Sequence, residues 1–220
     1  MTDRDQDRVA RVRDVFDDWA LRGRATAMAE SHAPVARRAV DALTLARTSW
    51  FLDIGCGNGY AVRWAAEAAP EGRAVGLDVA PEMIALARRL SAHHANAEFT
   101  VARFPEHDLP HGRFAAIFSM EVFYYLPDLD AALGETVRLL RPGGRFACAV
   151  DYYGENPASH GWPADLGVEM TLLDAAGWRE AFRRAGFASV TQDRVRIPAG
   201  DPRDGWKESE GSLLTIGVRS

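Results

Sequence analysis

Residues 50–60 read Trp50-Phe51-Leu52-Asp53-Ile54-Gly55-Cys56-Gly57-Asn58-Gly59-Tyr60. This is a hydrophobic run that ends in an acid and continues with glycines at alternate positions. Buried parallel strands are short, continuous apolar runs, and glycines directly after one let the backbone turn tightly and approach a small molecule. The pattern predicts a buried strand that leads into a ligand-binding turn.

The glycine spacing narrows the class of ligand. A dinucleotide fingerprint would need a glycine at position 60, where Tyr60 stands. The Gly-Lys-Ser/Thr ending of a triphosphate-binding loop is also missing from this segment. The carboxylate of Asp53 would repel a phosphate but would attract an ammonium group. The turn therefore favours a ligand with a zwitterionic amino-acid tail.

A second acid follows at the spacing of a nucleoside-binding fold. Residues 73–78 read as a short strand that ends in Asp78, about twenty residues after Gly55. An acid at the tip of the second strand is placed to accept hydrogen bonds from both ribose hydroxyls.

With these residues in view, the chain resembles a class I S-adenosylmethionine (SAM)-dependent methyltransferase of the small-molecule type, close to methyltransferase domains 11 and 25. The matching features run in the family's order over roughly residues 48–190. They are the segment Asp53 to Gly59, the acid Asp78, Leu126-Pro127-Asp128, Leu140-Arg141-Pro142-Gly143-Gly144 and Ala185-Gly186-Phe187.

The resemblance implies a set of contacts with SAM and with its product, S-adenosylhomocysteine. Methionine contacts are expected from Asp53, Gly55 and Gly57, ribose contacts from Asp78, and adenine contacts from Val79, Arg103 and Phe104. Met120 is expected near the sulfur, and Arg24 is expected to contact the carboxylate. Cys56 and Met83 are expected to bind the cofactor as well. One departure concerns adenine. Relatives often end the third strand in Gly-Asp, where this chain has Ala102-Arg103-Phe104, so backbone groups near Arg103 or the carboxylate of Asp108 would have to serve instead.

Alternation of strands and helices predicts a doubly wound, Rossmann-like α/β fold. Strands are expected at 50–54, 73–78, 97–102, 114–119, 144–151, 187–197 and 212–219, and helices at 59–69, 81–94, 129–140 and 174–185. The last two strands lack a helix between them and predict an antiparallel C-terminal strand in a seven-stranded, mostly parallel sheet. Residues 1–47 contain two helical stretches, which we expect to form a lid over a SAM-binding domain at 48–220.

Composition narrows the class of protein. A chain of 220 residues with 47% hydrophobic residues is long enough for one α/β domain. Its formal charge of −5 argues against broad contact with nucleic acid. Cys56 and Cys148 are placed for neither a disulfide framework nor a metal site. We expect no metal, no membrane span and a cytoplasmic protein, either monomeric or a homodimer.

The acceptor pocket is expected where the fourth and fifth strands end. Residues 121–125 and 151–163 reach that edge of the sheet, and the second segment combines aromatic, acidic and imidazole side chains. This loop can bind a polar or cationic molecule, or it can be a packed loop anchored by Trp162. Candidate catalytic groups are His160 as a base, with Tyr152, His32 and Tyr125.

These features favour a SAM-dependent methyltransferase that acts on a small molecule by in-line displacement. The acceptor and the accepting atom stay open at this point. A binding module with the same fold but without catalysis is the alternative, because the usual adenine carboxylate is missing. A nicotinamide-dependent oxidoreductase would require a different glycine spacing.

Overall fold

Seven strands form one sheet in the computed structural model, which describes residues 2–198 and 205–220. They are β1 (Trp50–Ile54), β2 (Arg73–Asp78), β3 (Ala97–Val101), β4 (Phe114–Met120), β5 (Leu140–Val150), β6 (Ser189–Val195) and β7 (Ser212–Val218). The order in space is β3-β2-β1-β4-β5-β7-β6. Strands β1 to β5 pair in parallel, and β7 runs antiparallel to both β5 and β6. The predicted doubly wound sheet with an antiparallel C-terminal strand is confirmed.

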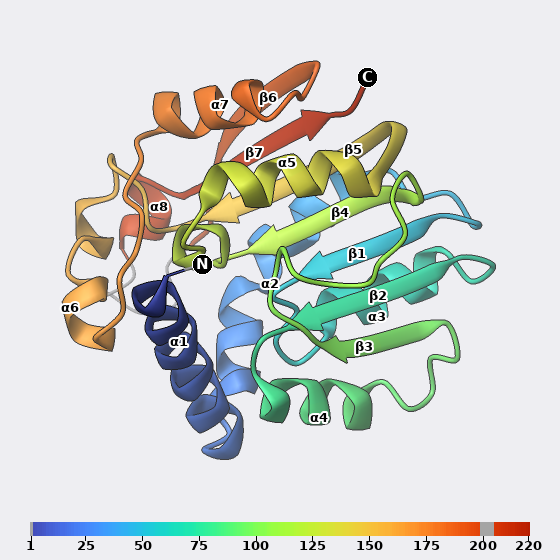
Figure 1. Cartoon of the computed structure of the whole chain (residues 1–220), viewed down its shortest axis with the longest axis horizontal. Coiled ribbons are helices and arrows are strands. Elements are labelled where there is room, and N and C mark those ends of the chain that lie inside the picture. The colour runs from blue at the N-terminus through green and yellow to red at the C-terminus, as the bar shows by residue number, and fades with distance from the viewer. Residues whose placement is uncertain (1, 199–204) are drawn as a thin grey trace.

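Helices cover both faces of the sheet (Figure 1). The described helices are α1 (Asp3–Leu21), α2 (Arg24–Ala42), α3 (Tyr60–Ala68), α4 (Pro81–Leu90), α5 (Leu129–Leu139), α6 (Trp162–Leu166), α7 (Ala175–Arg184) and α8 (Trp206–Ser209), with 3-10 turns η1 (Phe123–Tyr125) and η2 (Pro157–Ser159). Helices α5 and α7 pack on one face, and α2, α3 and α4 pack on the other. Two buried clusters result, one on each side of the strands.

The strand order reverses direction between β1 and β4, which are neighbours in the sheet. Connections from these two strands leave toward opposite sides, so a crevice opens at their carboxyl ends. Figure 1 shows α1 lying across this end of the sheet, to which the arrowheads of β1, β2 and β4 point. The fold therefore places the glycine turn after β1 beneath the N-terminal helices.

Specific contacts hold α1 and α2 over the crevice. Arg8 Nη2 donates to the carbonyl oxygen of Tyr124 at 2.9 Å. The ring of Phe16 meets Tyr125 edge to face, with centroids 5.8 Å apart. From the turn after β1, the side-chain amide of Asn58 donates to the carbonyl oxygen of Ala25 at 3.3 Å. The predicted lid helices therefore touch both the glycine turn and the segment after β4.

The ends of several elements differ from the prediction, most clearly at α4 and β5. Helix α4 ends at Leu90 rather than at residue 94, because the Ser91 amide bonds to the carbonyl oxygens of Ala87 and Arg88 and closes the last turn. Strand β5 starts at Leu140, which pairs with Phe114 before the register shifts. Helix α8 lies between the last two predicted strands, where no helix was expected, and residues 199–204 of that segment lie outside the described part of the chain.

Asp17 ties α1 to α4, and we predict that Asp17→Ala destabilises the fold by about 1 kcal/mol. The residue before α4, Ala80, has no side chain that can cap the helix. The Glu82 amide instead donates to Asp17 Oδ1 at 2.9 Å, so the capping oxygen comes from another helix. Urea unfolding measures the loss. Asp14→Ala, which removes an exposed carboxylate on the same helix, should change stability by less than about 0.5 kcal/mol. Equal losses in the two variants would contradict the capping role.

Candidate cofactor and acceptor site

The turn after β1 is fixed by hydrogen bonds to β2. The amides of Gly55 and Cys56 both donate to the carbonyl oxygen of Leu77, at 2.8 and 2.9 Å. Gly55 has φ +75°, a left-handed conformation that costs glycine little. A Cβ at Gly55 would lie 2.2 Å from Cγ2 of Val122. The backbone of the turn thus lies directly against the segment after β4.

Asp78 joins the turn to the tip of β2. Its Oδ2 accepts from the Gly57 amide at 2.8 Å, and its Oδ1 accepts from the Ala80 amide at 2.9 Å. Burial raises the pKa of Asp78 to about 6, and these backbone hydrogen bonds oppose the shift. Above that pH the carboxylate is ionised and retains lone pairs for further donors.

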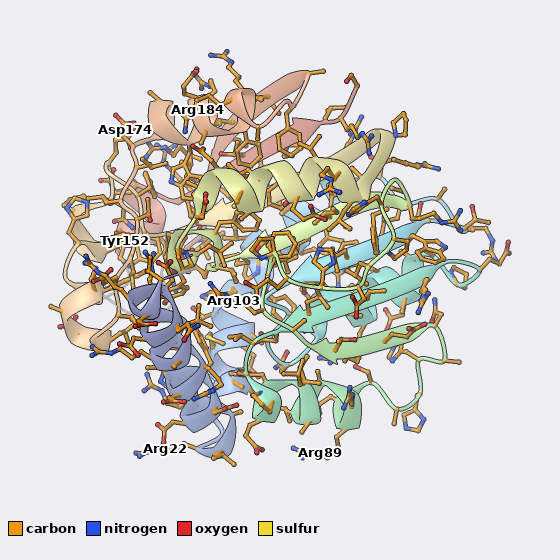
Figure 2. All side chains as sticks on the ribbon, viewed as in Figure 1. Arg22, Arg89, Arg103, Tyr152, Asp174 and Arg184 are labelled. Atoms are coloured by element: carbon orange, nitrogen blue, oxygen red, sulfur yellow. The ribbon has the colours of Figure 1, made fainter. Side chains whose placement is uncertain are left out.

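A first cavity opens above the turn. Most of the residues predicted to bind the cofactor line it, namely Asp53, Gly55, Cys56, Gly57, Asp78, Val79, Arg103, Phe104 and Met120. Two of the predicted catalytic residues, His32 and Tyr125, line it too. Figure 2 shows Arg103 between α1 and the sheet. The fold therefore brings together residues from the lid, the turn and the ends of β2, β3 and β4.

The far end of the first cavity is apolar. Phe104 is buried and stacks on His107 with centroids 5.5 Å apart. Val79 and Ala102 also line this end. Arg103 lies at 3.7 Å from Glu106, measured from Nη1 to Oε1. Asp108, which could have replaced the usual adenine carboxylate, is exposed and does not line the cavity.

A second cavity, of about 450 Å³, adjoins the first on the lid side. Its walls are aromatic and include Trp19, Tyr124 and Trp162, with the carboxylate of Asp165 at one side. Arg24, predicted to contact the cofactor, lines this second cavity, and its guanidinium lies 4.4 Å from the ring centroid of Trp19. The two cavities have five lining residues in common, which are Phe16, Met28, His32, Glu121 and Tyr125.

Three predicted site residues line neither cavity. Met83 is fully buried with Ala25 and Ala80 beneath the lid helices. His160 Nε2 lies 3.3 Å from the carbonyl oxygen of Tyr153. Tyr152 packs its ring between Tyr124 and His160, with centroids at 5.4 and 6.5 Å. Figure 2 shows Tyr152 on the segment after β5. This loop contributes Trp162 to the second cavity, whereas His160 and Tyr152 line neither cavity.

Glu121 was not predicted as a site residue, yet it lines both cavities. Its Oε2 accepts from the Tyr124 hydroxyl at 2.8 Å and its Oε1 accepts from the Asp151 amide at 2.5 Å. Burial and the negative charge of Asp151 raise the pKa of Glu121 well above its usual range. Its backbone has φ +59°, which is unusual for a residue other than glycine. Residues 121–125 were expected at the acceptor edge of the sheet because they follow a predicted strand, and this was the one signal for Glu121 in the sequence.

Electrostatics in the two cavities are dominated by carboxylates. Burial and the charge of Asp78 raise the pKa of Asp53 well above its usual range. Burial, together with the charge of Lys207, lowers the pKa of His32 to about 4, so this imidazole is neutral near pH 7. A cationic ligand would be favoured near the carboxylates of the two cavities.

The described residues contain no group of three or more His, Cys, Asp or Glu side chains that could hold a metal ion.

Comparison with known proteins identifies the family. A methyltransferase-domain family model matches residues 51–144. The chain is 34% identical to the nocamycin O-methyltransferase of Saccharothrix syringae over 90% of this chain and 81% of that protein. It belongs to the SAM-dependent methyltransferase family. It is also 39% identical to the demethylmenaquinone methyltransferase of Thermus thermophilus, over 50% of each chain, and so spans about half the length of that relative.

The chain also matches a solved relative over nearly the whole length of both proteins. The structure is a complex of the Haloferax volcanii Trm112 methyltransferase activator with a methyltransferase. The match has a TM-score of 0.86 and 35% identity, and it covers 92% of this chain and 96% of that one. The fold, the antiparallel strand and the order of the motifs are therefore those of this family.

The residues of the first cavity fit SAM, the cofactor of this family. Asp53 offers a buried carboxylate for an ammonium group, and Asp78 retains free lone pairs for ribose hydroxyls. Phe104 and Val79 offer apolar surface for a purine ring. A Cβ added to Gly57 would meet no atom within 4 Å, so the space beside this backbone is open to a ligand. The individual contacts remain predictions.

No helix in the described ranges is long and apolar enough to cross a bilayer.

Proposed function

We propose that this chain transfers the methyl group of SAM to a small molecule held in the second cavity. The observation that supports this most directly is the wall of five residues that the two cavities share. Bound SAM supplies an activated methyl group for in-line displacement, which requires a donor and an acceptor on opposite sides of one passage. Cavities that meet at Glu121 and Tyr125 satisfy that requirement.

The lining of the second cavity favours a small, partly aromatic acceptor. Phe16, Trp19, Tyr125 and Trp162 present rings from α1, η1 and α6. Flat apolar walls with few polar groups are typical of small-molecule sites, and a volume of about 450 Å³ lies within their size range. The relative from Saccharothrix syringae is an O-methyltransferase by name, which favours an oxygen nucleophile in this chain as well.

The chain would contribute positioning and water exclusion. Arg8 and Phe16 hold α1 against η1, and Phe16 lines both cavities. Exclusion of water and a fixed attack geometry can supply most of the rate for a reaction at an already activated carbon. His32 is neutral near pH 7, and its imidazole can accept a hydrogen bond from the acceptor hydroxyl. Tyr125 can orient the same group.

Methyl transfer is tested with SAM that carries a labelled methyl group and a panel of phenols, hydroxyaromatic acids and aliphatic carboxylic acids. Formation of S-adenosylhomocysteine together with a labelled product would support the proposal. Binding of both SAM and S-adenosylhomocysteine without turnover of any acceptor class would favour the alternative, a binding module without catalysis. Failure to bind either ligand would contradict both.

Trp162→Ala provides an internal test of the two-cavity arrangement. Trp162 lines the second cavity and does not line the first. We expect its removal to raise the KM for the acceptor about tenfold, since a buried aromatic contact is worth a few kcal/mol at most. The calorimetric affinity for S-adenosylhomocysteine should change by less than about twofold, because the cofactor contacts are intact. An equal loss of affinity for both ligands would contradict the separation.

A protein partner is also proposed. The relative from Haloferax volcanii is bound to the Trm112 methyltransferase activator, and this chain matches that methyltransferase over 96% of its length. Coexpression with an activator of the Trm112 kind, followed by size-exclusion chromatography with light scattering, should yield a one-to-one complex. Elution of the chain alone, as a monomer or a homodimer, would contradict this proposal and leave the methyl-transfer proposal unaffected.

A further inference from the structure

Glu121 is the one carboxylate among the five residues that line both cavities. Its neighbours in this shared wall are the rings of Phe16 and Tyr125, the thioether of Met28 and the imidazole of His32. A group that passes from one cavity to the other must pass these residues. In a methyltransferase the group that passes is a methyl attached to a positively charged sulfur.

We propose that Glu121 recognises the positive charge of the SAM sulfonium and so makes the site prefer SAM over its neutral product, S-adenosylhomocysteine. This rests on the family's cofactor and does not depend on the identity of the acceptor. Loss of the sulfonium charge on methyl transfer would remove the attraction, and the product would then exchange for fresh SAM more readily.

Backbone geometry supports a functional role for this residue. Glu121 has φ +59°, a left-handed conformation that is unfavourable for a residue other than glycine. Strained backbone of this kind persists where the surrounding structure enforces it, and it is concentrated at functional sites. Here the Tyr124 hydroxyl and the Asp151 amide each donate to one carboxylate oxygen and fix its direction.

Once Glu121 is ionised, none of the other four residues in the shared wall neutralises its charge near pH 7. Among the other four shared residues, His32 is the only titratable base, and its lowered pKa of about 4 keeps it neutral near pH 7. The faces of Phe16 and Tyr125 carry negative quadrupole density and therefore also favour a cation. The titratable or charged groups that interact with Glu121 are Asp151, Tyr124, Tyr125, Tyr60, Cys148 and Lys207, and Asp53 lies in the same cavity.

The proposal is tested by calorimetric binding of S-adenosylhomocysteine and of sinefungin, in which a carbon that bears a protonated amine replaces the sulfonium centre, so that the ammonium group carries the positive charge. Wild-type protein should bind sinefungin about tenfold more tightly than S-adenosylhomocysteine, as expected for one charge-assisted contact. In Glu121→Gln the two affinities should agree within about twofold. The same substitution at Glu71, an exposed carboxylate that pairs with Arg47 outside both cavities, should leave the preference intact.

The pH dependence gives a second readout that needs no variant at position 121. The pKa of Glu121 is raised, so the carboxylate ionises as the pH rises, and the sinefungin preference should increase with pH and then level off. Protonation of Asp78 affects both ligands alike and therefore cancels in the ratio of the two affinities. Tyr124→Phe removes a hydrogen bond that lowers the pKa of Glu121 and should move the midpoint to higher pH.

A preference for sinefungin that survives in Glu121→Gln, or a ratio that does not change with pH in the wild type, would overturn the proposal. Neither result would affect the proposed methyl transfer, which is measured by turnover. Wild-type protein that binds neither ligand would overturn this proposal and the cofactor site together.

Discussion

Asp78→Ala is expected to weaken the binding of S-adenosylhomocysteine about a hundredfold. Asp78 is held at the tip of β2 by two backbone amides, from Gly57 and Ala80, with lone pairs left on both oxygens. Hydrogen bonds to an ionised acceptor are worth about 1.5–3 kcal/mol, and each 1.4 kcal/mol is a factor of ten in affinity. Isothermal calorimetry measures the loss, and circular dichroism verifies that the variant is folded.

A ligand analogue separates a direct ribose contact from a structural role of Asp78 in the turn. The 2′-deoxy analogue of S-adenosylhomocysteine should bind wild-type protein about tenfold more weakly than the parent compound, because it lacks one donor. In Asp78→Ala the two compounds should bind alike. If the analogue loses the same factor in both proteins, Asp78 only shapes the turn and does not contact the ribose.

The same carboxylate sets a pH limit on binding. Burial raises the pKa of Asp78 to about 6, so the group is ionised above that pH and protonated below it. A protonated carboxyl is a weaker acceptor, and the affinity for S-adenosylhomocysteine should therefore fall as the pH drops from about 7.5 to about 5. Asp78→Asn should bind weakly throughout and lose most of this dependence.

The sheet and the cofactor turn could be predicted from sequence because they depend on local patterns. The apolar run of β1, the glycines after it and the acid at the end of β2 are each fixed by a strand or a tight turn. In a parallel sheet the ends of neighbouring strands meet at one edge, so residues such as Asp53 and Asp78 are brought together by topology alone. The same argument placed Met120 at the end of β4, and the structure has it lining the first cavity.

The acceptor side could not be predicted in the same way because it depends on the packing of loops and lid helices. His160 was a reasonable base by residue type, but the loop after β5 forms η2 and α6 and directs its ring toward the Tyr153 carbonyl. Met83, which the family resemblance implied as a cofactor contact, packs against Ala25 of α2 and lines neither cavity. The position of Glu121 between the two cavities arises from a left-handed backbone that residue type alone does not indicate.

Gly55→Ala should destabilise the protein by about 3 kcal/mol, measured by urea unfolding. At φ +75° any side chain costs about 1–2 kcal/mol, and the new Cβ would lie 2.2 Å from Cγ2 of Val122. The added overpacking costs about 1–3 kcal/mol. Val122→Ala in the Gly55→Ala background removes the methyl in closest contact and should recover about 1 kcal/mol, leaving the backbone cost in place.

Gly57→Ala is the matched comparison, since Gly57 also has a positive φ, of +50°, but a Cβ there would meet no atom within 4 Å. We expect it to cost only the backbone term, about 1 kcal/mol, and to lose affinity for S-adenosylhomocysteine because the methyl occupies ligand space. Equal losses of stability at the two positions would contradict the steric argument.

Since Val122 directly follows Glu121, a Gly55→Ala protein that relieves its clash by moving Val122 must also move the Glu121 carboxylate. Such a protein should therefore lose the preference for sinefungin, whereas Gly57→Ala should weaken both ligands and keep it.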